Sequence, residues 1–154
     1  MKYCLVWVLL IGLLLAFNSQ ADTSQIVTTK IEGHFPEVVH NIKSAIAGKG
    51  INIAHILPAS SMLNRTGSAY GYKENVFLDA QIIEFCSARL SQKLARLDPD
   101  NILACPFVIG ATVIPAEPDV VRVSYRVPTA RPGAEAVVHE IVELMQSIIE
   151  DASW

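Results

Sequence analysis

The stretch "PFVIGATVIPAEPDVVRVSYRVP" (106–128) decides the fold. Its first part, 106–115, is a nearly unbroken apolar run, which is typical of a β-strand covered on both faces. Its second part, 119–128, alternates between apolar and polar residues, as a strand with one exposed face does. The inward set is Val121, Val123, Tyr125 and Val127, and the outward set is Arg122, Ser124 and Arg126. The stretch therefore predicts two consecutive strands.

The residues before this stretch predict a strand, a helix and a second strand. The β-branched segment 24–32 and the apolar segment 51–58 have the composition of strands. Between them, Pro36 is suited to the first turn of a helix, and the glycines of 48–50 are suited to its end. The apolar residues of this helix recur at helical spacing and form one stripe.

The segment 75–86 fits either a strand or the start of a long helix. We favour the strand, because 87–98 already forms a complete helix with Ser87 as its N-cap. After the two strands of 106–128, an amphipathic helix is predicted over 132–152. The predicted order is β-α-β-β-α-β-β-α.

This order indicates one α+β domain with two layers, a split β-α-β (ferredoxin-like) arrangement whose helices cover one face of the sheet. In such an arrangement the strands at 75–86 and 106–115 run in the same direction, and the helix between them carries the chain back. Because 106–115 is apolar on both sides while helices cover one face, we expect the other face to meet a second copy. The sequence thus predicts a homodimer.

The N-terminus has the pattern of a secretory signal peptide over 1–21, followed by a single domain over 22–154. Lys2 is the charged residue, 3–17 is apolar, and Ser19-Gln20-Ala21 resembles a cleavage site. A membrane anchor is the alternative, but the apolar run is short for a membrane span, which needs about 20 residues. We expect a periplasmic or secreted protein without membrane contact after cleavage.

The charge of the mature chain excludes one class of partner. Without Lys2, 11 basic residues stand against 15 acidic ones, a net charge of −4. The chain has no basic cluster and few aromatic residues, so neither the electrostatic footprint nor the stacking platform of a nucleic-acid-binding protein is present.

Cys86 and Cys105 are the two cysteines that remain after cleavage. An even number in an oxidising compartment favours a disulfide. The predicted parallel strands argue against it, since they place the two residues at opposite ends of a sheet about 20 Å across. The Cα atoms of two bridged cysteines must lie within about 7 Å of each other. We therefore predict no bridge within one chain. Cys86 then stands at a helix N-terminus, where it is either an activated thiolate or a buried, inert residue.

The connection 59–75 is long for a compact domain, and such loops are often functional. A single helical turn could form at 60–64. Arg65 and Lys73, with Tyr70 and Tyr72, offer the donors that a small anion needs. A solvated flap is the alternative.

His55 shares a predicted strand face with apolar neighbours and could be a hydrogen-bonded core residue or line a pocket. With Met62 or a cysteine it could hold noncovalent haem or copper. His40 and His139 fall on the polar sides of their helices and are expected at the surface. The motifs of zinc peptidases, thioredoxin-like proteins and covalent haem attachment are missing from the sequence.

Several motifs together resemble the exported branch of the family called domain of unknown function 302. They are "FCSA", "LS", "DP.NI..CPFVI" and "VRVSYRVP", with "SSMLNRTG" upstream, within residues 24–128. The resemblance implies an α+β fold of this strand order, often dimeric, with no established reaction. It also implies one cysteine at the end of the third strand and one at the start of the fourth, which Cys86 and Cys105 match. The order Cys105-Pro106 reverses the usual Pro-Cys order of the family.

Two classes of function remain open at this stage. The first is a small-ligand-binding or accessory module that holds an anion or a sulfur compound beneath the loop of 59–75. The second is a redox carrier, or a metal- or haem-binding protein, that uses Cys86 or His55; an interaction protein without a small ligand is a further possibility. Because no catalytic set or phosphate loop can be assigned, we favour a binding module over an enzyme. The candidate ligand-binding residues are His55, Met62, Arg65, Tyr70, Tyr72, Cys86 and Cys105.

Overall fold

The computed structural model describes residues 25–154, so the predicted signal peptide lies outside the described residues. The elements follow one another as β1 (Ile26–Glu32), α2 (Phe35–Gly48), β2 (Ile53–Leu57), α3 (Ala59–Thr66), η1 (Gly67–Tyr70), β3 (Asp79–Phe85), α4 (Ala88–Leu97), η2 (Pro99–Ala104), β4 (Phe107–Ile114), β5 (Glu117–Arg126) and α5 (Glu135–Ala152). Each strand and helix predicted from the sequence is present. Within the described part of the chain, no helix combines the length and the apolar character that a membrane span requires.

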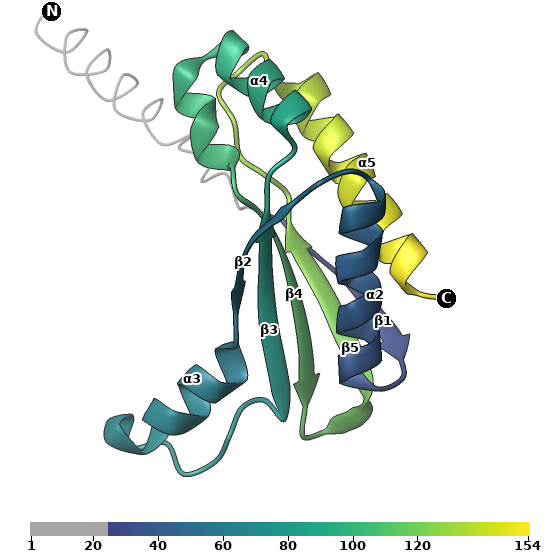
Figure 1. The fold of residues 1–154 in the computed structure, drawn as a ribbon. Helices are drawn as coiled ribbons and strands as arrows, with labels where there is room; N and C mark the ends of the chain where they lie inside the picture. The colour runs from purple at the N-terminus through teal and green to yellow at the C-terminus, as the bar shows by residue number, and fades with distance from the viewer. Residues whose placement is uncertain (1–24) are drawn as a thin grey trace, which may run out of the picture.

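One sheet with the strand order β1-β5-β4-β3-β2 forms the first layer (Figure 1). Every neighbouring pair in it is antiparallel. β1 and β2 therefore lie at opposite edges and run in the same direction, with α2 connecting them in a split β-α-β unit. Helices α2 and α5 cover the same face of the sheet and form the second layer. The predicted α+β two-layer fold class is confirmed.

The expected direction of the fourth strand was wrong. β3 and β4 are antiparallel neighbours, with Phe85 opposite Phe107, whereas the sequence led us to expect parallel strands. The connection over 86–106 contains α4 and η2, and it leaves and returns at the same end of the sheet. A helix between two strands can cross over to a parallel strand, or it can return the chain to the same end of the sheet and start an antiparallel strand. Only the strand pairing distinguishes the two.

The core lies between the helices and one face of the sheet. The predicted stripe of α2 is buried there, and α5 adds a second buried stripe; together they are Val38, Val39, Ile42, Ile46, Val137, Ile141, Met145, Ile148 and Ile149. β5 presents Val121, Val123 and Tyr125 to these helices, as its alternation predicted. Burying one such apolar side chain stabilises the fold by about 1.5–3 kcal/mol. The apolar side of each strand is therefore held against the helices, and the opposite side faces away from them.

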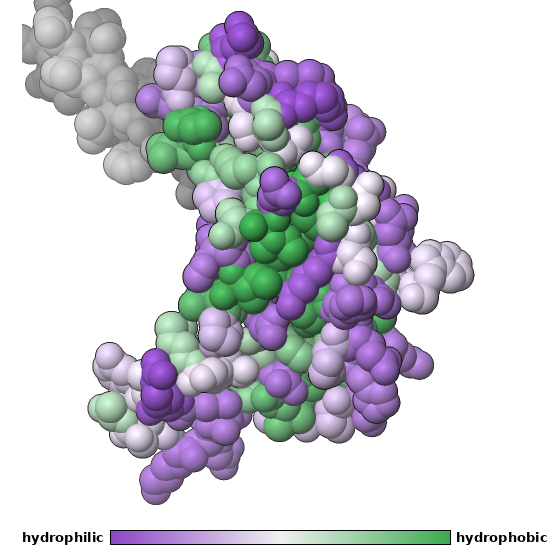
Figure 2. Space-filling model, in the orientation of Figure 1, coloured by the Kyte–Doolittle hydropathy of each residue, from purple (hydrophilic) through white to green (hydrophobic). Residues whose placement is uncertain are grey.

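That opposite side, the open face, is not covered by α2 or α5 (Figure 1). Alternate residues of β4 are buried in the core, whereas Val108, Gly110, Thr112 and Ile114 are only half-buried. Within the described chain, the helices cover one face of the apolar run of 106–115, as expected, and the contact of its other face with a second copy stays a prediction. In Figure 2, hydrophobic surface gathers over the middle of the sheet, between its two ends.

The connection between β2 and β3 forms an arm, residues 59–76, that projects from one end of the sheet (Figure 1). It contains the two helical turns of α3 followed by η1, more than the single turn expected at 60–64. The Ser60 hydroxyl donates to the carbonyl of Ala80 at 3.5 Å, and Asn64 donates from Nδ2 to the carbonyl of Phe77 at 3.4 Å. These two contacts fasten the arm to the start of β3.

Candidate functional site

Cys86 and Cys105 form a disulfide, so the prediction that they stay unbridged was wrong. Their Cα atoms are 6.0 Å apart. The two residues lie next to Phe85 and Phe107, which are paired across β3 and β4 and whose buried rings meet edge to face at 6.1 Å. The large separation expected from parallel strands therefore does not arise. With both sulfur atoms bonded, Cys86 is not a free thiolate at the start of α4.

The segment 87–104, which we call the lobe, is also held by polar contacts. Asn101 is 2% exposed; its Nδ2 donates to the Leu94 carbonyl at 3.2 Å and its Oδ1 accepts from the Arg131 amide at 2.7 Å. Lys93 of α4 lies 2.6 Å from Glu140 of α5. The hydrogen bond from Lys93 is the largest effect that holds the pKa of Glu140 below its usual value. The lobe is thus attached at several points besides the disulfide.

His55 does not lie in the apolar row that the sequence predicted. Ile53 pairs with Phe85, on the core side of the sheet. A β-bulge then shifts the register, so that His55 pairs with Glu84 and is exposed on the open face. An inserted residue turns the following side chain to the other face of a strand, and this is why a regular alternation misplaced His55.

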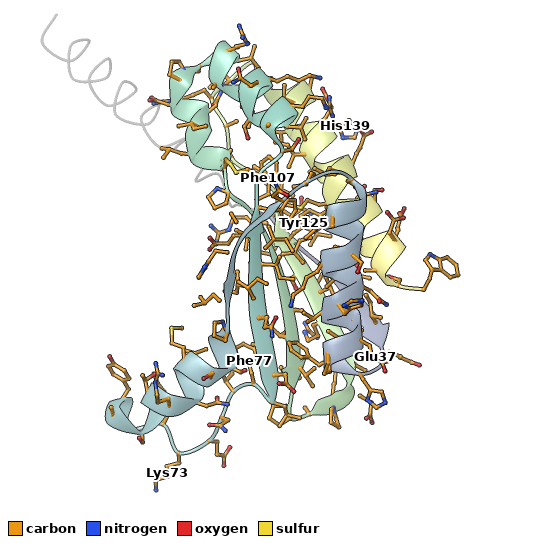
Figure 3. The ribbon with its side chains drawn as sticks, in the orientation of Figure 1. Glu37, Lys73, Phe77, Phe107, Tyr125 and His139 are labelled. Carbon is orange, nitrogen blue, oxygen red and sulfur yellow. A yellow bond between two sulfur atoms is a disulfide. The ribbon has the colours of Figure 1, made fainter. Side chains whose placement is uncertain are left out.

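The other two histidines considered from the sequence are where they were expected. His40 and His139 are exposed on α2 and α5 (His139 is labelled in Figure 3), and His139 lies 3.4 Å from Glu143. Among residues 25–154, no three His, Cys, Asp or Glu side chains are grouped closely enough to hold a metal ion.

The arm surrounds a hollow of about 510 Å³. Two of the predicted ligand-binding residues, Tyr70 and Tyr72, line it. Met62 and Arg65 belong to the same arm but are not among its lining residues. Lys73 also borders the hollow, yet its side chain points away from the domain at the tip of the arm (Figure 3). Two of the four predicted arm residues are thus brought together at one hollow.

The predicted residues do not converge on a single site. The arm precedes the first residue of β3, and the disulfide follows its last residue. A strand of seven residues separates them by roughly 20 Å. His55 is opposite Glu84, two residues before Cys86, and belongs to neither the arm nor the disulfide. The cysteines and the arm tyrosines are therefore candidates for different sites.

A second hollow, which the sequence reasoning missed, lies near the disulfide. It has a volume of about 520 Å³, and we call it the end groove. Its lining includes Ile26 of β1, Leu103 of η2, Pro106, Val108 of β4, Arg126 of β5 and Pro128. The alternation of 119–128 did place Arg126 on the outward side of its strand. The other walls come from distant segments, and no pattern in the sequence unites them.

Comparison with known proteins agrees with this architecture. No curated protein matches the chain. Among solved structures, the chain is similar to the crystal structure of uncharacterized conserved protein DUF302 from Bacillus stearothermophilus, with a TM-score of 0.69 and 10% identity. The similarity covers 82% of this chain and 97% of that one, and at this identity it concerns the fold alone. The model of the family described as "Domain of unknown function DUF302" matches residues 27–152, nearly the whole described chain, and the protein therefore belongs to that family.

Proposed function

We propose that this protein is an exported module that binds a small ligand in the hollow of its arm. Export is supported by the signal-peptide pattern of 1–21 and by the Cys86–Cys105 disulfide, because disulfides persist in oxidising compartments such as the periplasm. Recovery of the chain from the periplasmic fraction with Asp22 as its first residue would support export, and recovery of uncleaved chain from the cytoplasm would contradict it.

The observation that carries the proposal is the chemistry of the arm hollow. Leu63 and Val76 border it together with Tyr70 and Tyr72, and all four are exposed. Apolar and aromatic walls with a few polar groups are typical of small-molecule sites. These four exposed apolar side chains lie within fourteen residues of the sequence. Such a cluster indicates a binding surface, whereas single exposed apolar side chains scattered over a protein do not.

One polar atom of the hollow's lining indicates what a ligand must supply. Asn64 borders the hollow, and its Oδ1 is buried without a hydrogen-bond partner within the described chain, while its Nδ2 is bonded to Phe77. A buried acceptor without a partner is unfavourable by about 1–3 kcal/mol. A small, mostly apolar ligand with one N–H or O–H donor would relieve this cost. An anionic or sulfur-containing group would lie at the rim, beside Lys73.

Native mass spectrometry of protein purified from the periplasm tests this proposal. We expect a bound small mass on the wild-type chain, lost in Tyr72→Ala and retained in the matched control Arg65→Ala, which alters the same arm outside the hollow. Circular dichroism would establish that both variants are folded. An absence of bound mass on the wild-type chain, or equal loss in both variants, would contradict the proposal.

We also propose that two copies associate through the open face. Its middle carries the half-buried residues Leu57, Ile82 and Val108. To be stable, this interface would bury about 800 Å² on each partner. Sedimentation analysis at micromolar concentration should give a dimer that Ile82→Glu dissociates; a wild-type monomer would refute this association.

A redox role is the second candidate, and the paired cysteines favour it. Both are half-buried and not fully enclosed. Titration in a glutathione buffer distinguishes a redox carrier from a structural bridge: a midpoint near −200 mV supports exchange, whereas one below about −300 mV supports a structural role. A haem or metal site that uses Cys86 lacks support in the disulfide-bonded form, because the Cys86 sulfur is bonded to Cys105.

A further inference from the structure

The end groove has the construction of a binding site that differs from the arm hollow. It lies at the other end of the sheet, where β1, β4 and β5 meet η2 and the segment after β5. Its apolar walls come from three segments of the chain: Ile26, the stretch 103–108 with Leu103, Pro106 and Val108, and Pro128. Ile26 is 64% exposed and Leu103 is 86% exposed, so these walls meet solvent in the absence of a ligand.

A single cation stands beside these apolar walls. Arg126 is exposed on the open face of β5, and within residues 25–154 it forms no ion pair with a carboxylate. The same strand provides a direct contrast, since Arg122, four residues earlier and on the same face, lies 3.3 Å from Glu117. Glu117 in turn lies 2.6 Å from Lys30, and these contacts hold its pKa below the usual value. Within residues 25–154, one arginine of the open face is thus paired with a carboxylate, whereas the arginine at the groove is not.

Neutral hydroxyl groups complete the polar part of the groove. Ser124 and Thr129 belong to its lining, and the Ser124 hydroxyl is hydrogen-bonded to that of Thr28 at 2.8 Å. Tyr125 adds no charge, because burial raises the pKa of its hydroxyl. The lining thus contains one positively charged residue, three residues with hydroxyl groups and mainly apolar residues.

The disulfide holds one wall of the groove in position. Ala104 and Pro106, on either side of Cys105, both belong to the lining. Cys105 is bonded to Cys86 at the end of β3, and Phe107 beyond it is 2% exposed in the core. A wall fixed in this way loses little conformational freedom on binding, and such preorganisation favours affinity.

We propose that the end groove binds an amphipathic organic carboxylate with an unbranched apolar chain. The planar guanidinium of Arg126 can form two parallel hydrogen bonds with a carboxylate. The chain would then lie along Leu103, Pro106 and Val108. One cation among the described lining residues suits a monoanion, and a volume of about 520 Å³ is within the range of ordinary small-molecule sites.

Calorimetric titration of the exported chain with sodium hexanoate, octanoate and decanoate, each below its micelle concentration, tests this inference. Affinity should rise about fourfold for each methylene group added until the groove is filled. Arg126→Gln should weaken octanoate binding at least tenfold, because a charge-assisted pair is lost. The matched control Arg122→Gln, on the same strand face, should stay within twofold of the wild type. Octanol, which has no charge, should bind at least tenfold more weakly than octanoate.

Equal octanoate affinity in Arg126→Gln and the wild type, or affinity independent of chain length, would overturn the inference. Sedimentation with and without octanoate gives a second readout: if octanoate only converts a dimer to monomers, the groove is a contact between copies and the inference fails. Tyr72→Ala should leave octanoate binding unchanged, so the outcome is separate from that of the arm hollow. Loss of octanoate binding in folded Tyr72→Ala would place the ligand in the arm and contradict the assignment.

Discussion

Reduction of the Cys86–Cys105 disulfide should lower the free energy of unfolding by about 3 kcal/mol. The two residues are 19 positions apart in the sequence. For a closed loop of this size, the chain-entropy model gives a loss of roughly 11 cal/mol/K in the unfolded chain, which is about 3 kcal/mol at 25 °C. For a domain of this size, this corresponds to a fall in the melting temperature of roughly 10 °C.

The folded state should change little on reduction, because other contacts attach the lobe. Asn101 joins the end of α4 to Arg131, Asp100 lies 2.8 Å from Arg131, and Glu140 joins α4 to α5. Most of the loss in the free energy of unfolding should therefore come from the unfolded state, which is more compact when the disulfide crosslinks it. The denaturant slope should accordingly be larger after reduction, since more surface is then exposed on unfolding.

Urea denaturation with and without reductant measures both quantities, and thiol titration confirms the state of the bridge in each sample. The double variant Cys86→Ser, Cys105→Ser is the control, and its unfolding midpoint should not respond to reductant. If the oxidised and reduced chains unfold at the same midpoint and with the same slope, the loop-entropy reasoning is wrong. A reduced chain that loses the circular dichroism of its folded state would show instead that the bridge holds the native lobe together.

Three further predictions concern the core and the lobe. Phe107→Ala should lower the free energy of unfolding by about 3–5 kcal/mol, because its ring is buried against Phe85; a loss below 1 kcal/mol in urea denaturation would contradict this packing. Asn101→Ala should cost about 1–3 kcal/mol for each buried backbone group left without a partner, and amide exchange should accelerate in the lobe before the sheet; unchanged exchange there would refute its role. The pKa of Glu140 is lowered chiefly by Lys93, so its carboxylate stabilises the fold above the ordinary value of 4.5 and this contribution is lost as the pH falls through the lowered folded value. The difference in stability between the wild type and Glu140→Gln should be largest at neutral pH and close on acidification; a difference that does not depend on pH would contradict the ion pair.

The local sequence by itself determined the identity and the exposed side of most elements. Ser87 caps α4 as predicted, its hydroxyl accepting from the Leu90 amide at 3.5 Å. The stripe of α2 and the alternation of β5 are both found in the structure, with the apolar side buried. These features follow from side-chain periods of 3.6 and 2 residues, which a single chain segment carries without reference to any other segment. The position of Arg126 on the outward side of β5 was predictable for the same reason.

Only the tertiary structure decided which segments meet. The pairing of Phe85 with Phe107 makes β3 and β4 antiparallel, and this pairing brings Cys86 within bonding distance of Cys105. The bulge in β2 places His55 on the open face, although a regular strand would have kept it on the side of Ile53. The end groove likewise depends on η2 returning to the same end of the sheet from which α4 departs. The direction of a strand and the return of a loop depend on contacts between residues far apart in the chain, and a local periodicity contains no information about them.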